Sequence, residues 1–145
     1  MKGDCPEGEY IVPLGKANVM KEGSDVTIIS WSRMVHTSLA AASLLEKDGI
    51  SCEVIDLQSL VPLDKDTILD SIKKTGKAVI VHEAVKTSGF GAEVAAIIAD
   101  EAFSFLKSPI KRVTAPDTPI PYASKLEDAF IPNEAKIISA VRSII

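Results

Sequence analysis

The sequence predicts a three-layer α/β sandwich around a mostly parallel five-stranded sheet. Short β-branched runs alternate with longer segments in which apolar residues recur every three to four positions. Such alternation places helices on both faces of a parallel sheet, with right-handed crossovers between the strands. Hydrophobic residues make up 46% of the 145 positions and aromatic residues only 5%, so the predicted core is aliphatic.

Helix stops and starts divide the chain into elements. Helices are predicted to end at Gly49 and Gly76, because glycine adopts the left-handed conformation that ends a helix. Pro62 and Asp64 mark a helix start, with Asp64 as the N-cap. The early KANVMKEG stretch predicts an antiparallel edge strand that turns back through Gly23. The predicted strands are 25–30, 51–60, 77–83 and 110–116, and the predicted helices are 34–49, 62–76, 90–106, a short one near Leu126 and one within 133–145.

Charge and hydropathy exclude several function classes. A net charge of −4 disfavours nucleic-acid binding and anionic membrane surfaces, which both need basic protein surface. No apolar run approaches the roughly 20 residues of a membrane helix. Residues 1–14 are predicted to form a polar lead-in without a signal peptide, and residues 15–145 the domain. Cys5, expected to be exposed, and Cys52, expected in a strand, match no metal spacing, which favours a reduced, cytoplasmic setting.

The stretch VHEAVKTSGFGAEVAAIIADEAF, residues 81–103, is the strongest candidate for a site. Gly89 and Gly91 lie between a strand and a helix, as in dinucleotide-binding loops, but Val94 stands where that fingerprint needs a third glycine. Ser88 and the free N–H groups of the helix could hold an anion. The favoured alternative is that the glycines permit a sharp turn and close packing.

His82 and Glu83 lie at the predicted carboxyl end of a strand, where open α/β sheets bind ligands. Adjacent strand residues point to opposite faces, so these two are not expected to form a catalytic dyad. A structural or interface role is therefore favoured over catalysis. His36, one position after Val35, is predicted on the surface of the first helix. Neither histidine belongs to a metal-binding pattern.

Two polar sites and one proline-rich segment complete the candidates for a functional surface. Asp56 could face a crevice at the end of its strand, and Lys111 and Arg112 could pair with carboxylates. The PDTPIPYA segment, residues 116–123, contains three prolines and is interpreted either as a rigid connector or as a surface for a partner. By motif alone, the chain shows no catalytic machinery and no P-loop.

Several stretches are similar to one known family. They are GSDVTIISWSRMV, AASLLEKDGISCEVIDLQSLVPLD, VIVHEAVKTSGFGAEVAAII, SPIKRVTAPDTPIPYA and LEDAFIPN, in this order. Together they resemble the transketolase C-terminal domain family, and within it the C-terminal domain of the E1 β subunit of 2-oxo acid dehydrogenase complexes. The resemblance covers the chain from about Tyr10 to Ile145. VHEA with GFGAE is similar to branched-chain and acetoin-type β subunits, and pyruvate-type relatives remain open.

The resemblance implies a division of labour. In the complete enzyme, thiamine diphosphate, Mg²⁺ and the catalytic residues lie between the α subunit and the N-terminal domain of the β subunit. The present sequence contains no G-D-G…N-N diphosphate and metal motif. This domain is therefore expected to bind no cofactor and no metal and to be inactive alone. The complete enzyme would oxidatively decarboxylate a 2-oxo acid and transfer the acyl group to lipoyl-E2.

The resemblance also implies a role in assembly. The expected partners are the E1 α subunit, a second β subunit and the E2 peripheral subunit-binding domain. Relatives dock E2 through their C-terminal carboxylate, which nominates Ile145, and they carry an acidic residue where this chain has Lys107. The alternative function is a stand-alone regulatory module that binds an anionic ligand at the Gly89–Gly91 turn.

Overall fold

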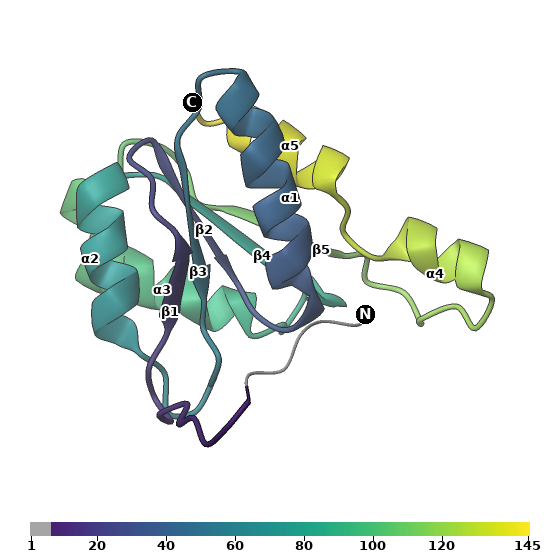
Figure 1. Ribbon diagram of the computed structural model, residues 1–145. Helices are drawn as coiled ribbons and strands as arrows, with labels where there is room; N and C mark the ends of the chain where they lie inside the picture. Colours follow the sequence, from purple (N-terminus) through teal and green to yellow (C-terminus); the bar gives the residue numbers. More distant parts are fainter. Residues whose placement is uncertain (1–6) are drawn as a thin grey trace.

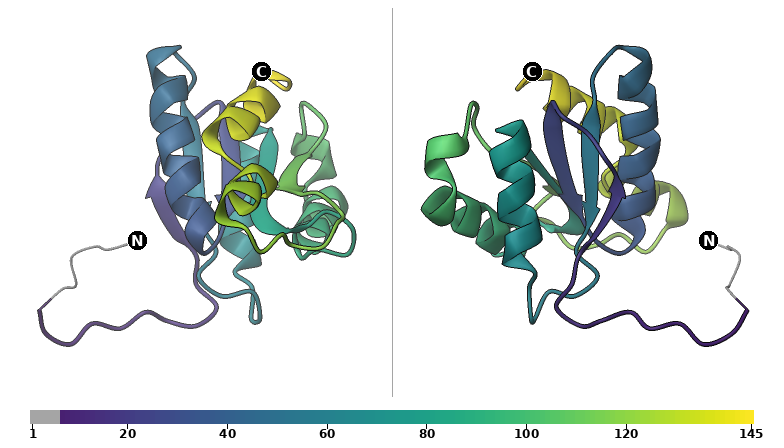
Figure 2. Two further views of the ribbon diagram at one scale, coloured as in Figure 1. Left: turned by 90° about the vertical axis from the view of Figure 1, so that its right-hand side faces the viewer. Right: turned by 60° about the vertical axis from the view of Figure 1, so that its left-hand side comes forward.

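Residues 7–145 are described by the structure, a computed structural model built around one five-stranded sheet (Figure 1). The strands are β1 (Asn18–Lys21), β2 (Val26–Ser30), β3 (Cys52–Asp56), β4 (Ala78–Val85) and β5 (Lys111–Ala115). The helices are α1 (Arg33–Lys47), α2 (Lys65–Thr75), α3 (Gly91–Glu101), the short 3₁₀ helix η1 (Phe103–Phe105), α4 (Ser124–Phe130) and α5 (Glu134–Arg142). Helices α1 and α5 cover one face of the sheet and α2 and α3 the other, so the predicted fold class is confirmed (Figure 2).

The strand order is β1-β3-β2-β4-β5. Strands β2, β3, β4 and β5 are parallel to their neighbours, and β1 is antiparallel to β3 at one edge. From the central β2 the chain moves outward to β3 and then crosses back to β4 on the other side. The direction of winding therefore reverses between β2 and β4, the place where open α/β sheets form a crevice.

The predicted turn at Gly23 is wrong, although the antiparallel edge strand is present. Strand β1 pairs with β3, with Asn18 opposite Asp56. It does not form a hairpin with the strand that follows it. A Cβ atom on Gly23 would lie 2.2 Å from the main chain of Cys52 and Glu53. Glycine is needed here because the chain passes directly against the start of β3, not because it reverses direction.

Side chains alternate between two aliphatic cores along the parallel strands. Val79 and Val81 of β4 pack with α1 and α5, whereas Ile80 between them packs with α2 and α3. All five residues of β2 are buried, as expected for a central strand that is covered on both faces. Within residues 7–145, none of the helices combines the length and apolarity that crossing a bilayer requires.

Asp64 fixes two segments of the chain at once. Its carboxylate caps α2 by accepting from the Thr67 N–H at 3.3 Å and the Thr67 hydroxyl at 2.9 Å, which confirms the predicted N-cap. It also accepts from the Ala17 N–H at 3.0 Å, just before β1. The Gly15 N–H donates to Ser59 Oγ at 2.9 Å. These bonds join the segment before β1 to the loop that leads into α2.

Several predicted boundaries shift. The predicted helix 90–106 ends at Glu101 and is followed by η1, so its last turn is not α-helical. The predicted strand 51–60 ends at Asp56, because Asp56 accepts from the Gln58 N–H at 3.1 Å in a turn and Gln58 has a positive φ. The strand predicted as 77–83 runs on to Val85.

Candidate functional site at the carboxyl edge of the sheet

The carboxyl ends of β2 and β4 meet where the winding of the sheet reverses. Trp31 follows the last residue of β2, and His82 lies in the last part of β4. The two rings are stacked, with centroids 5.1 Å apart and planes 14° apart. Phe90 meets Trp31 edge-on, at 5.9 Å and 88°. The sequence placed His82 at this edge but gave no sign of Trp31 beside it.

His82 is completely buried, and neither ring nitrogen has a hydrogen-bond partner within residues 7–145. Burial, assisted by the positive charge of Arg112, lowers the pKa of His82. The imidazole is therefore neutral at physiological pH. A neutral ring enclosed by aromatic and glycine residues is suited to packing, and it lacks the access that a substrate would need.

The Gly89–Gly91 turn receives the imidazole ring. A Cβ atom on Gly91 would lie 2.5 Å from Cδ2 and Nε2 of His82, and one on Gly89 would lie 2.7 Å from Cε1. Both distances are far below van der Waals contact, so the ring fits only because these positions lack side chains. Ser88 is exposed and has a φ of 58°. The N-terminus of α3 has no side-chain cap and carries Glu93 in its first turn, whose charge opposes an anion there.

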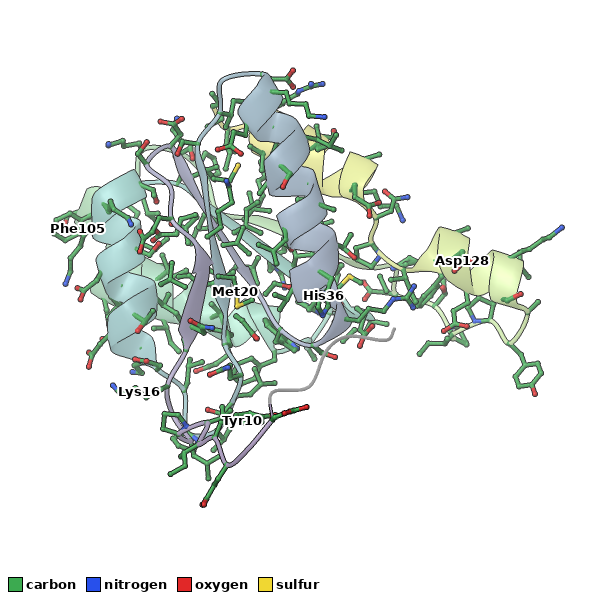
Figure 3. The ribbon with its side chains drawn as sticks, viewed as in Figure 1. Tyr10, Lys16, Met20, His36, Phe105 and Asp128 are labelled. Atoms are coloured by element: carbon green, nitrogen blue, oxygen red, sulfur yellow. The ribbon has the colours of Figure 1, made fainter. Side chains whose placement is uncertain are left out.

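Glu83 does not join His82. Side chains alternate along β4, so Glu83 lies on the same face as Val81, which packs toward α1. His82 lies on the opposite face, with Ile80. Glu83 is partly buried at the end of the strand. His36 is exposed on α1, as predicted, and is labelled in Figure 3. The two histidines and Glu83 therefore do not form one chemical site.

A link between two loops was missed by sequence reasoning. The Thr87 N–H and hydroxyl donate to the two carboxylate oxygens of Asp117, each at 2.8 Å. These bonds lower the pKa of Asp117, so the carboxylate stays charged. They connect the loop before α3 to the proline-rich segment, 30 positions away in sequence, a pairing that no local pattern could indicate.

A buried polar cluster was also missed. Glu53 of β3 is 1% exposed and pairs with Lys74 and the Ser71 hydroxyl of α2. Thr27 Oγ1 lies 2.6 Å from Ser71 Oγ and 2.7 Å from Thr75 Oγ1. The available signal was the row of polar residues on the inward face of α2. Every member has a protein partner, so this cluster is structural.

Residues 15–137 match the family described as "Transketolase, C-terminal domain". The chain belongs to this family. It is 48% identical over 142 residues to the pyruvate dehydrogenase E1 component subunit beta of Bacillus subtilis (strain 168), covering 98% of this chain and 43% of that protein. It is 43% identical over 145 residues to the acetoin:2,6-dichlorophenolindophenol oxidoreductase subunit beta of the same strain, covering 100% of this chain and 42% of that protein.

The solved structures agree with the family assignment. A chain of "Split gene transketolase, inactive beta4 tetramer" superposes with a TM-score of 0.81 at 28% identity, covering 97% of this chain and 44% of that chain. A chain of a 2-oxoglutarate:ferredoxin oxidoreductase from Magnetococcus marinus gives a TM-score of 0.56 at 11% identity and shows the fold alone. The transketolase C-terminal domain described here spans less than half the length of these relatives.

His82, Trp31, Phe90 and the two glycines of the turn form what we call the His82 cluster. In this transketolase C-terminal domain, Lys107 and Ile145 lie away from it. The Lys107 N–H donates to the Gly76 carbonyl at 2.8 Å, and its aliphatic stem covers Gly76 just before β4 begins. Ile145 follows α5, whose Arg142 pairs with Asp48 at 2.6 Å beyond the end of α1. Both residues are exposed at the amino edge of the sheet, on opposite faces.

The domain offers little for covalent or metal chemistry in the residues that the structure describes. Burial, followed by the charge of Asp25, raises the pKa of the Cys52 thiol to about 11, so the thiol stays protonated. Cys52 lies in β3, as predicted, while Cys5 falls outside the described residues. Within residues 7–145, no group of three or more His, Cys, Asp or Glu side chains could hold a metal ion.

Proposed function

We propose that this chain is the C-terminal assembly domain of the β subunit of a thiamine-diphosphate-dependent 2-oxo acid dehydrogenase E1. The observation that carries this proposal is the alignment of essentially the whole chain with E1 β-type subunits at 43–49% identity. The complete cytoplasmic enzyme would oxidatively decarboxylate a 2-oxo acid and transfer the acyl group to lipoyl-E2. Relatives of the pyruvate and acetoin types align about equally well. Acetoin is a hydroxy ketone and pyruvate a 2-oxo acid, and we assign the 2-oxo acid class without naming its member.

Thiamine diphosphate does not fit the Gly89–Gly91 turn, the candidate anion turn of this domain. The glycine turn that could approach a diphosphate is filled by the His82 ring, and Glu93 adds a negative charge to the helix that follows. We therefore place the cofactor and its Mg²⁺ in other parts of the complete enzyme and assign no catalytic step to this chain. Its own role is to hold subunits together.

Exposed apolar side chains support an assembly role. The 116–123 segment and α4 extend from the body of the domain (Figures 1 and 2). Ile120 is 69% exposed, Leu126 is 60% exposed and Tyr122 is fully exposed. Large apolar side chains gathered on a projection are typical of protein interfaces. We assign this projection to contact with the E1 α subunit or a second β subunit.

We assign E2 docking to the amino edge of the sheet. Where Ile145 is the natural C-terminus, its carboxylate would meet a basic E2 peripheral subunit-binding domain through charge-assisted hydrogen bonds. Lys107 lies at the same edge on the other face, and it would weaken docking at longer range because it places a positive charge where the family's pattern has an acid.

A domain exchange tests the proposed function. The aligned segment of the B. subtilis pyruvate dehydrogenase β subunit is replaced by this chain, and the chimera is produced with the matching α subunit. We expect pyruvate decarboxylation to be restored relative to a β subunit that lacks the segment. A folded chimera that supports no more turnover than the truncated subunit would contradict the proposal.

The alternative is a regulatory module that binds an anion at the Gly89–Gly91 turn, where Ser88 is exposed. A thermal melt of the chain with phosphate or ATP separates the two functions. An anion site filled at 100 times its dissociation constant would add about 2.7 kcal/mol to the free energy of unfolding. We expect no such stabilisation from either compound.

A further inference from the structure

A groove of about 550 Å³ is lined by β5 and α5. Strand β5 is the last in the sheet, so no other strand of the described chain pairs with its outer side. Consecutive residues 112–116 line the groove. Val113 and Ala115 face the core beneath α5, whereas Arg112 and Thr114 alternate with them and point to the other face of the sheet. Since residues that point to both faces line the groove, we infer that it follows the outer main-chain edge of β5 and not one face of the sheet.

The second wall of the groove is one stripe of α5. Lys136, Ser139, Ala140 and Ser143 lie at positions i, i+3, i+4 and i+7. Except for Lys136 these side chains are small, so they leave room between the helix and the strand edge. The five residues of β5 give an edge of roughly 17 Å at about 3.3 Å per residue, the length of an extended peptide of similar size.

The groove is positively charged in a protein whose net charge is −4. Lys86, Arg112 and Lys136 line it, against one carboxylate, Asp117, which is held by Thr87. Arg112 Nη1 donates to the Lys86 carbonyl at 3.0 Å, which fixes the guanidinium beside the strand edge. Its other N–H groups have no acceptor within residues 7–145 and can donate to a ligand.

We propose that this groove binds an extended acidic segment of a partner protein, which adds as a strand to β5. The edge would supply main-chain hydrogen bonds, and the three cations would select carboxylate side chains. A second copy of this chain offers the groove no carboxylate, because antiparallel pairing of β5 with itself about Val113 would place Arg112 opposite Thr114 and Lys111 opposite Ala115. The residues of the groove carry this inference independently of the assignment to E1 β.

A titration followed by nuclear magnetic resonance tests the groove. The ¹⁵N-labelled chain is titrated with the end-capped peptide TETVEVET, with its lysine counterpart TKTVKVKT as control. We expect the amide signals of Arg112 to Ala115 to shift with the acidic peptide alone. Lys86→Glu should weaken binding about fivefold, because it reverses an exposed charge at the groove. The matched control is Lys73→Glu on the distant α2, which should leave the affinity unchanged.

Three results would overturn the proposal. The first is the absence of shifts along β5 with the acidic peptide. The second is an equal loss of affinity in the Lys73 and Lys86 variants, which would indicate general charge attraction. The third is displacement of the peptide by free glutamate at the same carboxylate concentration, which would indicate a site for small anions and no strand addition.

Discussion

Individual residues at the carboxyl edge explain why a histidine, two glycines and a tryptophan occur together. His82 is neutral because it is buried, and it is buried because Gly89 and Gly91 leave space for its ring while Trp31 covers it. Sequence reasoning singled out both glycines and the histidine, but it did not predict that the His82 ring packs against the two glycines. That contact joins residues seven and nine positions apart across a loop, and no periodic pattern encodes it.

Gly91→Ala tests this packing. The new Cβ would lie 2.5 Å from the His82 ring, so we expect a loss of about 1–3 kcal/mol in the free energy of unfolding, measured with urea. The same substitution in a His82→Ala background should cost much less, because the ring is gone. Equal costs in the two backgrounds would show that the glycine serves another purpose.

Glu53 tests the buried polar cluster. Glu53→Ala removes the acceptor that Ser71 and Lys74 share, but Lys74 keeps Glu22 as a partner at 2.8 Å, so we expect a loss of about 2 kcal/mol. The control is Glu46→Ala, which removes an exposed ion pair with Lys21 and should cost at most about 1 kcal/mol. Urea unfolding measures both variants, and similar losses would argue against a special role for the cluster.

At the scale of helices and strands, local signals predicted most of the fold. Asp64 identified the start of α2, Gly76 its end, and the β-branched runs identified β2 to β5. The pairing of β1 was mispredicted at Gly23, since a glycine needed for close approach resembles a glycine needed for a turn. The last turn of the helix predicted to reach 106 was wrong because apolar periodicity continues through η1 after the α-helix has ended.

Asp64 gives a prediction at this scale. Burial raises its pKa, but hydrogen bonds from Ala17 and Thr67 lower it more, so the pKa in the folded protein lies below the ordinary value. The carboxylate therefore stabilises the fold above the unfolded pKa of about 3.9, and this stability is lost as pH falls through the folded pKa. Asp64→Asn keeps a cap but removes the charge.

The measurement is urea unfolding of both proteins between pH 6 and pH 2. We expect the parent to be more stable at pH 6, with the difference shrinking as the acid range is entered. A difference that does not change with pH would mean that the charge of Asp64 contributes nothing.

At the scale of the whole molecule, different functions are assigned to separate regions. The His82 cluster lies at the carboxyl edge, Lys107 and Ile145 lie at the amino edge, and α4 with its Asp128 extends to one side (Figure 3). Sequence reasoning predicted the stiff proline-rich segment but not its tie to Thr87 or the groove along β5. Both depend on how distant segments meet, which only the folded chain shows.

Lys107→Asp tests the assignment of E2 docking. The substitution replaces a positive charge with a negative one, so we expect binding to a basic E2 peripheral subunit-binding domain to strengthen by about tenfold at low salt. Calorimetry on the chimeric E1 measures the change. Lys65→Asp at the start of α2, on the opposite edge of the sheet, is the control and should have little effect. If the affinity of the Lys107 variant did not increase, position 107 would not belong to the docking surface.

The native mass of the chimeric β subunit mixed with its α subunit tests the central claim most directly, because that claim concerns assembly. We predict a single species with the mass of two α and two β chains, and its loss when Ile120 and Tyr122 on the exposed projection are both changed to serine. A folded chimera that remains separate from the α subunit would contradict the assembly function.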